Sequence, residues 1–204
     1  MGDDRQEIII IPYTGGGLGV EDLLATKKLS RPSAVRLLKK YSDELSRCCH
    51  PKGAVVPIKV SSDPEGITLE GRTFGNSHIR ELMEGCHTAW LYYATSGKEL
   101  EGAQCFDSAS MRDMFAFAAM LRMMDKVQEY FRTVIGLKDP VNLLSQAAGE
   151  FSENDTDLLK ELGSAAMEKL GIHFDSHGIM RPWNTLWGIM YEKKGVGKDH
   201  FLGY

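Results

Sequence analysis

Residues 82–97 read LMEGCHTAWLYYATSG, and they carry the clearest structural signal in the chain. Positions 89–94, AWLYYA, are apolar almost throughout, which predicts a strand that is covered on both faces of a sheet. The polar run Thr95-Ser96-Gly97 ends that strand. Before it, Ser77 can cap a short helix. The apolar stripe expected on this helix consists of Ile79, Leu82, Met83 and Cys86.

Two longer helices follow this strand in the sequence. Over roughly Ser108–Thr133, apolar residues recur every three or four positions, as in a helix with one buried face. Its first half, Met114–Leu121, is apolar all round, so we expect it to lie centrally. We also expect the five methionines between positions 111 and 124 to fill the core. The second helix begins at Ser152, which has capping-box spacing to Asp155, and a C-cap at Gly171 ends it.

The remaining elements define the fold class. A helix is predicted over Ser30–Arg47, where Pro32 suits the first turn. Strands are predicted at Ile8–Ile11, Ala54–Val60, Ile67–Leu69, Ile172–Asp175 and Leu186–Tyr191. Helices and strands mix without the strict alternation of a doubly wound sheet, which favours the α+β class. Because the sequence shows neither an internal repeat nor a low-complexity linker, we expect residues 1–204 to form a single domain.

Composition argues against several classes of function. The 204 residues include 24 basic and 28 acidic side chains, a net charge of −4, whereas a general nucleic-acid binder needs a basic face. The longest apolar run, Met114–Leu121, is far shorter than the ~20 residues that span a bilayer. We therefore expect neither a nucleic acid nor a membrane as partner. The acidic start, Met1–Asp4, is unlike a secretory signal, so we expect a cytoplasmic protein whose cysteines are thiols.

Three motifs that could carry chemistry are incomplete. The loop Thr14–Gly19 lacks the third glycine of a dinucleotide fingerprint and the Gly-Lys-Ser/Thr of a phosphate loop, so a plain loop is favoured. Thr95-Ser96-Gly97 is not a nucleophile elbow. Asp107, Asp113 and Asp125 are present near the long helix. No carboxylate pair can be assigned among them without geometry, and we assign no catalytic residue.

Cysteine and histidine clusters raise the question of a metal site. Cys48-Cys49-His50 and Cys86-His87 supply ligands that zinc prefers, but neighbouring side chains diverge and no Cys-x-x-Cys spacing exists. We predict no metal site, and we expect Cys86 to be a core residue. His173 and His177 are expected on the surface. A thiol or metal enzyme that uses Cys48, Cys49 and Cys86 is the alternative.

Several segments, taken in order, resemble the reactivation domain of cobalamin-dependent methionine synthase and its small stand-alone relatives. That family has a helix ending in Leu-x-Gly-Cys, an apolar strand, Ala-Thr-x-Gly and a long helix. Near its C-terminus it has Met-x-Pro-x-x-Ser and a Gly-aromatic strand. The corresponding stretches here are Leu82–His87, Ala89–Tyr93, Ala94–Leu100, Met180–Thr185 and Gly188–Tyr191. The resemblance covers about residues 30–204, and residues 1–29 match poorly.

The resemblance implies a largely antiparallel, twisted sheet with packed helices, and a role in corrinoid-dependent methyl transfer. In the full-length enzyme this domain binds S-adenosylmethionine and presents its methyl group to a corrinoid whose cobalt has been oxidised. An electron from a flavodoxin-type donor and that methyl group restore methylcobalamin. A stand-alone member is expected to serve a separate corrinoid protein or methyltransferase, so cobalamin would arrive on the partner protein.

The resemblance also indicates which residues bind the cofactor. The family's Gly-Tyr loop precedes a helix that begins here at Ser152. The residues expected to line the pocket are Ala148, Gly149, Phe151, Tyr191 and Phe201. The family's loop also carries an arginine that anchors the methionine carboxylate. Residues 144–151, LSQAAGEF, contain no arginine, proline or tyrosine, and Glu150 would repel a carboxylate. Gly149 is equally compatible with a plain turn before the helix.

Beside the thiol or metal enzyme, two functions therefore stay open from the resemblance. One is an accessory protein of corrinoid-dependent methyl transfer that binds S-adenosylmethionine. The other is a non-catalytic binding or scaffold protein that kept the fold and lost the S-adenosylmethionine site, which the missing arginine favours.

Overall fold

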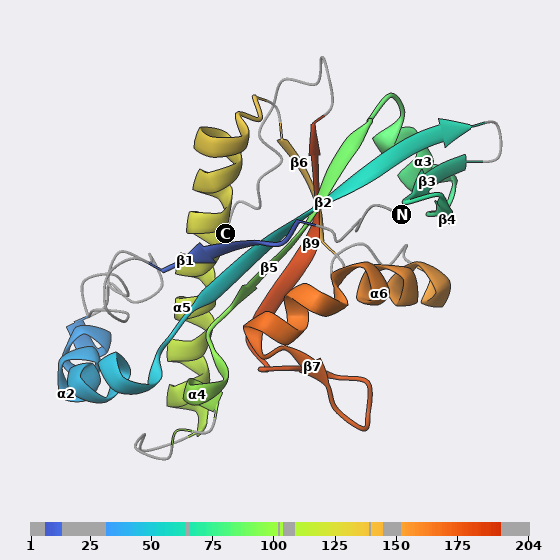
Figure 1. Cartoon of the computed structure of the whole chain (residues 1–204). Helices are drawn as coiled ribbons and strands as arrows, with labels where there is room; N and C mark the ends of the chain where they lie inside the picture. Colours follow the sequence, from blue (N-terminus) through green and yellow to red (C-terminus); the bar gives the residue numbers. More distant parts are fainter. Residues whose placement is uncertain are drawn as a thin grey trace.

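A twisted antiparallel sheet forms the centre of the computed structural model, which describes residues 7–13, 32–63, 66–101, 103, 109–138, 140–144 and 152–192 (Figure 1). Its strands are β1 (Ile9–Pro12), β2 (Lys52–Asp63), β3 (Gly66–Leu69), β4 (Arg72–Phe74), β5 (Thr88–Thr95), β6 (Pro140–Leu144) and β9 (Thr185–Glu192). Their order is β4-β3-β2-β5-β9-β6, and β1 pairs with the start of β2. A separate ribbon joins β7 (His173–Phe174) and β8 (Met180–Arg181).

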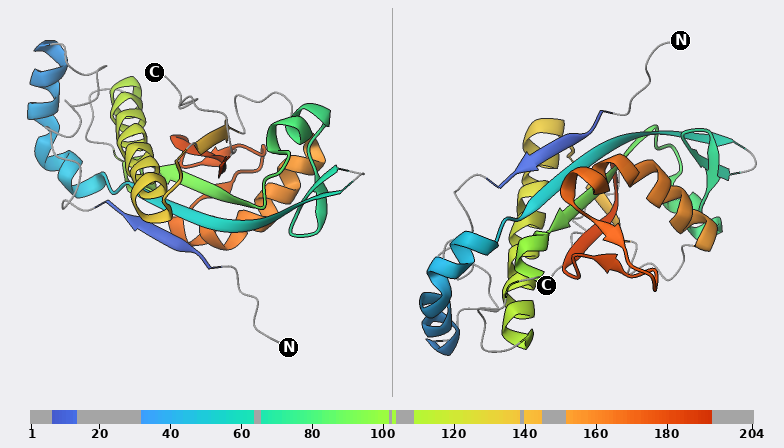
Figure 2. Two further views of the ribbon diagram at one scale, coloured as in Figure 1. Left: turned by 90° about the horizontal axis from the view of Figure 1, so that it is seen from above. Right: turned by 60° about the horizontal axis from the view of Figure 1, so that its bottom comes forward.

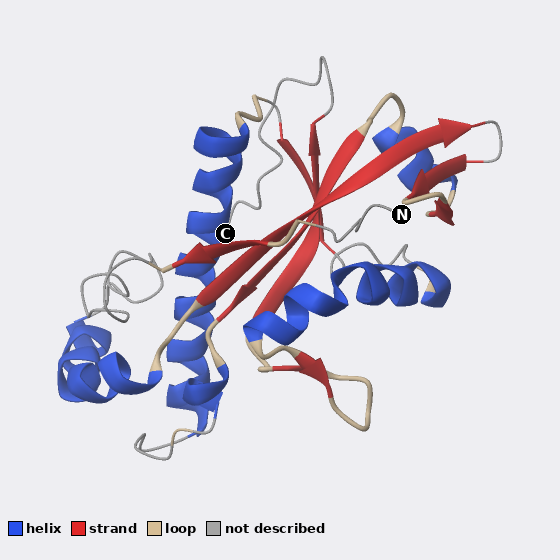
Figure 3. Cartoon of the chain, viewed as in Figure 1, coloured by secondary structure: helices blue, strands red, loops and turns tan. Residues whose placement is uncertain are grey.

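Helices cover both faces of this sheet (Figures 2 and 3). The helices are α2 (Pro32–Cys48), α3 (Ser77–Met83), α4 (Lys98–Glu101), α5 (Ala109–Tyr130) and α6 (Glu153–Leu170). α5 crosses one face and continues into the π-helical turn η2 (Phe131–Ile135), while α6 lies on the other face. α2 and α4 pack beside the N-terminal half of α5. The described residues thus form an α+β fold, the class that the sequence predicts.

Strand β5 serves both faces through the alternation of its side chains. Successive strand residues point to opposite faces, so Tyr93 packs on the α6 side and Tyr92 on the α5 side. Both rings are fully buried, which confirms the prediction of a strand covered on both faces. Tyr93 stacks on Trp187 with 6.2 Å between the ring centroids, and Tyr92 meets Phe131 edge to face.

Methionines fill much of the core between α5 and the sheet. Met120, Met123 and Met124 are buried there, which confirms their predicted role. The first half of α5 is covered on its far side as well, where Phe115 packs edge to face on Tyr41 of α2. Within the described ranges, no helix combines the length and the apolar character needed to cross a membrane.

Helix α6 begins and ends as the sequence predicts. The Ser152 hydroxyl accepts a hydrogen bond from the Asp155 backbone N–H, and the Asp155 carboxylate accepts one from the Ser152 N–H, both at 3.1 Å. Asp155 also accepts from the N–H of Gly75 at 2.7 Å, which ties the first turn of α6 to the loop before α3. Gly171 ends the helix in the left-handed region, with φ of 73°.

Two glycines allow unusually close packing. A Cβ atom at Gly163 of α6 would overlap the hydroxyl of Tyr93, so this glycine lets the helix lie directly on the ring. A Cβ atom at Gly188 of β9 would overlap the carbonyl of Leu143 and lie 2.8 Å from the Tyr92 hydroxyl. Gly188 is paired with Leu144, the last residue of β6, so its missing side chain allows β6 to stay against β9.

The structure corrects several sequence expectations. Asn76, not Ser77, caps α3, because the Asn76 side chain accepts a hydrogen bond from the Ile79 N–H at 3.0 Å. β2 is longer than predicted. Its last residues, Val60–Asp63, lie beyond the stretch that pairs with β5 and pair with β3 instead. β4 and β6 were not predicted, since β4 has three residues and β6 opens with a proline, which is tolerated at the start of an edge strand. The loop Thr14–Gly19 lies outside the described residues.

Candidate functional site

Two of the segments that carry the family resemblance meet at one end of the sheet. Thr95 at the end of β5 lies opposite Thr185 at the start of β9, and their buried hydroxyl oxygens are 3.0 Å apart. The backbone N–H of Ser96 donates to the carbonyl of Asn184 at 3.1 Å. The Thr185 hydroxyl also lies 2.8 Å from the carbonyl of Pro182. These contacts fix the segment before β9 against the end of β5.

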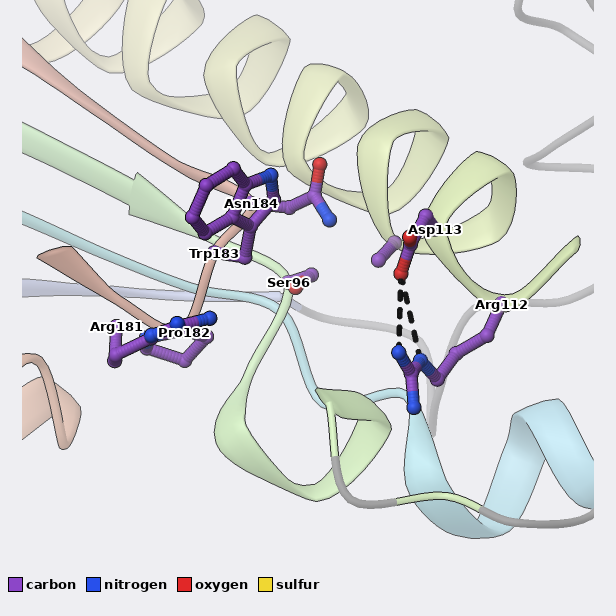
Figure 4. Close-up of a pocket in the computed structure, with 8 residues that line it drawn as sticks. Ser96, Arg112, Asp113, Arg181, Pro182, Trp183 and Asn184 are labelled. Carbon is purple, nitrogen blue, oxygen red and sulfur yellow. Dashed lines mark hydrogen bonds and ion pairs between the residues drawn. The ribbon is translucent and has the colours of Figure 1, made fainter. Parts of the chain in front are cut away.

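A cavity of about 140 Å³ opens beside this junction, between the start of α5 and the segment before β9 (Figure 4). Its lining consists of Ser96, Arg112, Asp113, Ala116, Arg181, Pro182, Trp183 and Asn184. A second cavity of about 220 Å³ shares Trp183 and Asn184 with the first and continues along Phe117, Met120 and Leu121 of α5. Considered together, the charged first cavity and the second one, most of whose lining residues are apolar, reach the lower end of the range for small-molecule pockets, about 300–1,000 Å³.

One side of the first cavity presents a carboxylate. Asp113 lies in the early part of α5, with 53% of its side chain exposed. Its Oδ1 atom is 3.4 Å from both Nε and Nη2 of the neighbouring Arg112. These contacts are longer than the 2.7–2.9 Å or so of strong charged hydrogen bonds, so the pair is loosely held and Asp113 stays accessible to a cation.

The opposite side of the cavity presents a guanidinium group that is held in place. Nε of Arg181 donates to Oδ2 of Asp175 at 3.1 Å, and Oδ1 of Asp175 accepts from the backbone N–H groups of Ile179 and His177. The hydrogen bond from Ile179, followed by those from His177 and Arg181, lowers the pKa of Asp175 below its usual value. The Arg181 guanidinium also lies 4.9 Å from the centroid of the Trp183 ring. Asp175 therefore keeps its charge and orients Arg181.

Trp183 lies at the boundary between the two cavities. It is 57% exposed, and among the described residues no other Phe, Tyr or Trp side chain is classed as exposed. Exposed tryptophan beside a cavity offers a flat apolar face against which a planar ligand can stack. The site therefore combines a carboxylate, a guanidinium and an aromatic face within one groove.

The site residues expected from the resemblance are only partly placed. Ala148, Gly149, Phe151 and Phe201 lie outside the described residues. Tyr191 is on β9, fully buried, and belongs to the core on the α6 side. Leu144, which stands before these loop residues, is paired with Gly188 of β9. Gly188 comes three residues after Thr185, which lines the second cavity. The assignment of these five residues stays a prediction.

Two tyrosine hydroxyls on the α6 side are buried and have no hydrogen-bond partner within the described part of the chain. They belong to Tyr93 and Tyr191. Burial raises the pKa of both, and it is the main cause that raises the pKa of Tyr191 to about 12, with the nearby Cys86 as a smaller cause. Both phenols are therefore neutral at physiological pH.

The thiols of Cys49 and Cys86 are poor candidates for chemistry. Burial, with Cys48 as a smaller cause, raises the pKa of Cys49 to about 12, and burial also raises the pKa of Cys86. A protonated thiol is a weak nucleophile and a weak ligand. Cys86 lies in the core, as predicted, and His173 and His177 are exposed, as predicted. In the ranges that the structure describes, no three His, Cys, Asp or Glu side chains gather as metal ligands.

Most of the cavity residues could not be identified from the sequence. Asp113 was one of several acids near a helix, and nothing in the pattern distinguished it. Arg181 and Trp183 were noted only as the variable positions of a Met-x-Pro-x-x-Ser stretch. The one available signal was a tryptophan, Trp183, between Pro182 and Asn184, in a segment that leads into a buried strand.

Comparison with known proteins supports the fold. The chain matches no protein-family model and no curated protein sequence. Among solved structures it is similar to the crystal structure of the MetH reactivation domain bound to AdoHcy, with a TM-score of 0.61 and 12% sequence identity. The match covers 93% of this chain and 79% of that one. At this level of identity the likeness concerns the fold alone, and it confirms that the chain has a fold of the methionine synthase reactivation-domain type.

Proposed function

We propose that this protein is an accessory protein of corrinoid-dependent methyl transfer that binds S-adenosylmethionine or its demethylated product. The observation that carries the proposal is the likeness, over 93% of the chain, to a reactivation domain solved with S-adenosylhomocysteine bound. The groove between α5 and the segment before β9 supports it, because a likeness in fold without a cavity would leave no place for such a ligand.

The chemistry of the groove suits an adenosyl sulfur ligand. Its apolar part, beside Trp183, can take a flat nucleobase, and its charged part can take the amino acid end. The carboxylate of Asp113 complements the ammonium group of that end and the positive sulfonium of S-adenosylmethionine. Binding both in one orientation would position the methyl group, so that its transfer becomes close to a unimolecular step.

The partner proteins follow from this role. The chain would present the methyl donor to a corrinoid protein or methyltransferase, which brings the cobalamin, and a flavodoxin-type protein would supply the electron. The cobalamin supplies the cobalt chemistry when it is bound to its own protein. The residues of this chain bind and orient the methyl donor, in a cytoplasmic setting.

One observation favours a second function. Residues 144–151 lack the arginine that the resemblance places there, and they contain Glu150 instead. A scaffold protein that kept the fold and lost the nucleotide would need no such arginine. Under this alternative, an arginine introduced at Ser145 or Gln146 should not create binding.

Calorimetric titration with S-adenosylhomocysteine and S-adenosylmethionine tests the proposal directly. We expect saturable binding by the wild-type protein and weaker binding by Asp113→Asn. The matched control is Asp125→Asn, because Asp125 is a second exposed acid of α5 that pairs with an arginine but does not line either cavity. Wild-type protein that binds neither compound would make the scaffold function the correct one. Co-purification with a corrinoid protein then tests the partner.

A further inference from the structure

The first cavity carries opposite charges on opposite sides. Figure 4 shows Asp113 on the helix α5 side and Arg181 on the side of the segment before β9, with Ser96 between them. The α5 wall carries Asp113 with Arg112 beside it, and the other wall carries Arg181, so the cavity offers charges of both signs to a zwitterion, such as the ammonium and carboxylate of an α-amino acid. The fold therefore offers two charged contacts for one end of a ligand.

Arg181 is built into the structure as a fixed cation. Oδ1 of Asp175 accepts hydrogen bonds from two backbone N–H groups of its own hairpin, at 2.9 Å and 3.0 Å. Oδ2 of Asp175 accepts one from Nε of Arg181 at 3.1 Å. The backbone position of Arg181 is set by β7–β8 pairing, in which it lies opposite His173. Trp183 supports one face of the guanidinium. Because these contacts fix its orientation, little side-chain entropy remains to be lost when an anion binds.

Arg112, the other guanidinium at this cavity, is less suited to the same task. Both of its contacts go to Asp113, the adjacent residue on the same helix, at 3.4 Å. Any movement of Arg112 toward an anion would leave Asp113 without its neighbouring cation. Arg181 has its own carboxylate in Asp175, on a different element, and Asp113 is not involved.

We infer that Arg181 is the carboxylate anchor of the ligand, and that it takes the place of the arginine missing from residues 144–151. The inference rests on the proposed function, since it names which wall of the cavity receives the amino acid end of the adenosyl compound. A planar guanidinium matches a carboxylate with two parallel hydrogen bonds, which a lysine cannot reproduce.

The test compares two ligands that differ only at this end. S-adenosylhomocysteine carries the amino acid group, whereas 5′-methylthioadenosine keeps the nucleoside and the thioether sulfur but has neither ammonium nor carboxylate. For Arg181→Gln we expect the affinity for S-adenosylhomocysteine to fall about 10- to 100-fold. The affinity for 5′-methylthioadenosine should stay within about twofold of wild type. Arg181→Lys, which keeps the charge but not the fork, should give an intermediate loss.

Two control variants make the outcome decisive. Arg47→Gln removes an exposed arginine of α2 that lines neither cavity and should change neither affinity. Arg112→Gln removes the competing guanidinium. If Arg112→Gln discriminates between the two ligands and Arg181→Gln does not, or if Arg181→Gln weakens both equally, the anchor assignment is wrong while the proposed function stands. If the wild-type protein binds neither compound, the proposed function itself is wrong.

Discussion

The two faces of the sheet differ in how completely their tryptophan side chains are buried. On the α6 side, Trp187 lies against Tyr93 and is only 6% exposed. On the α5 side, the core ends at Trp183, which is 57% exposed and borders both cavities. The two tryptophans are four residues apart. Their difference teaches that position relative to the start of β9, rather than residue type, determines which aromatic builds the core and which is available to a ligand.

The largest expected effect separates these two tryptophans. Trp187→Ala should lower the free energy of unfolding by about 3–5 kcal/mol, because it empties a packed position next to Tyr93. Trp183→Ala should change it by no more than about 0.5 kcal/mol, as is usual for an exposed position. Urea denaturation of both variants measures the contrast. Similar losses for the two would mean that the segment before β9 is part of the core.

The next effect concerns the close contact of α6 with the sheet. Gly163→Ala should destabilise the protein by about 1–3 kcal/mol, although alanine favours helices, because Tyr93 is held by its stack and cannot move away from the new methyl group. The control is Tyr93→Phe, which removes an unpartnered hydroxyl and should be neutral or stabilising. In the double variant, part of the Gly163→Ala loss should disappear. Fully additive effects would argue against this contact.

A smaller loss is expected at the start of α6. Ser152→Ala removes half of the capping box and should cost about 1 kcal/mol of stability. Ser164→Ala, at an exposed position within the same helix, is the matched control and should be neutral or slightly stabilising, because alanine is the better helix former. Thermal unfolding of the two variants distinguishes a cap effect from a general effect of removing a hydroxyl.

The smallest effect appears only at alkaline pH. Tyr191 has its pKa raised to about 12 in the folded protein, whereas an unfolded tyrosine ionises near about 10. Between these values the unfolded state loses its proton first, so the free energy of unfolding falls as pH rises above about 10. Urea midpoints measured from about pH 8 to about pH 11 should therefore decline less steeply for Tyr191→Phe. An unchanged slope would mean that Tyr191 is accessible to water.

The sequence is informative wherever local chemistry is sufficient. The strand at 89–94 and helix α6 with its capping residues could be predicted because hydrophobic periodicity and caps act over a few neighbouring residues. β6 could not, because it is short, begins with proline and depends on Gly188 for its place beside β9. The cap of α3 was placed one residue too late, at Ser77 instead of Asn76, because asparagine and serine both cap helices and stand next to each other here.

The groove was largely invisible in the sequence for a different reason. Ser96, Asp113 and Arg181 come from three distant parts of the chain, and only the pairing of β5 with β9 and the packing of α5 bring them together. The resemblance predicted a site near the end of the chain and the loop before α6. The structure places Tyr191 in the α6-side core, and the loop itself lies outside the described residues.

Gly188 has a consequence for how such a protein can evolve. Any side chain there would push Leu143 and Tyr92 aside and break the hydrogen bond at 2.8 Å between the Tyr92 hydroxyl and Asn142. The edge strand β6 would then lose its pairing with β9 near Leu144, the residue at which β6 ends. The absence of a side chain at Gly188 thus fixes where β6 ends beside β9. The loop that the family resemblance associates with nucleotide recognition follows that end of β6.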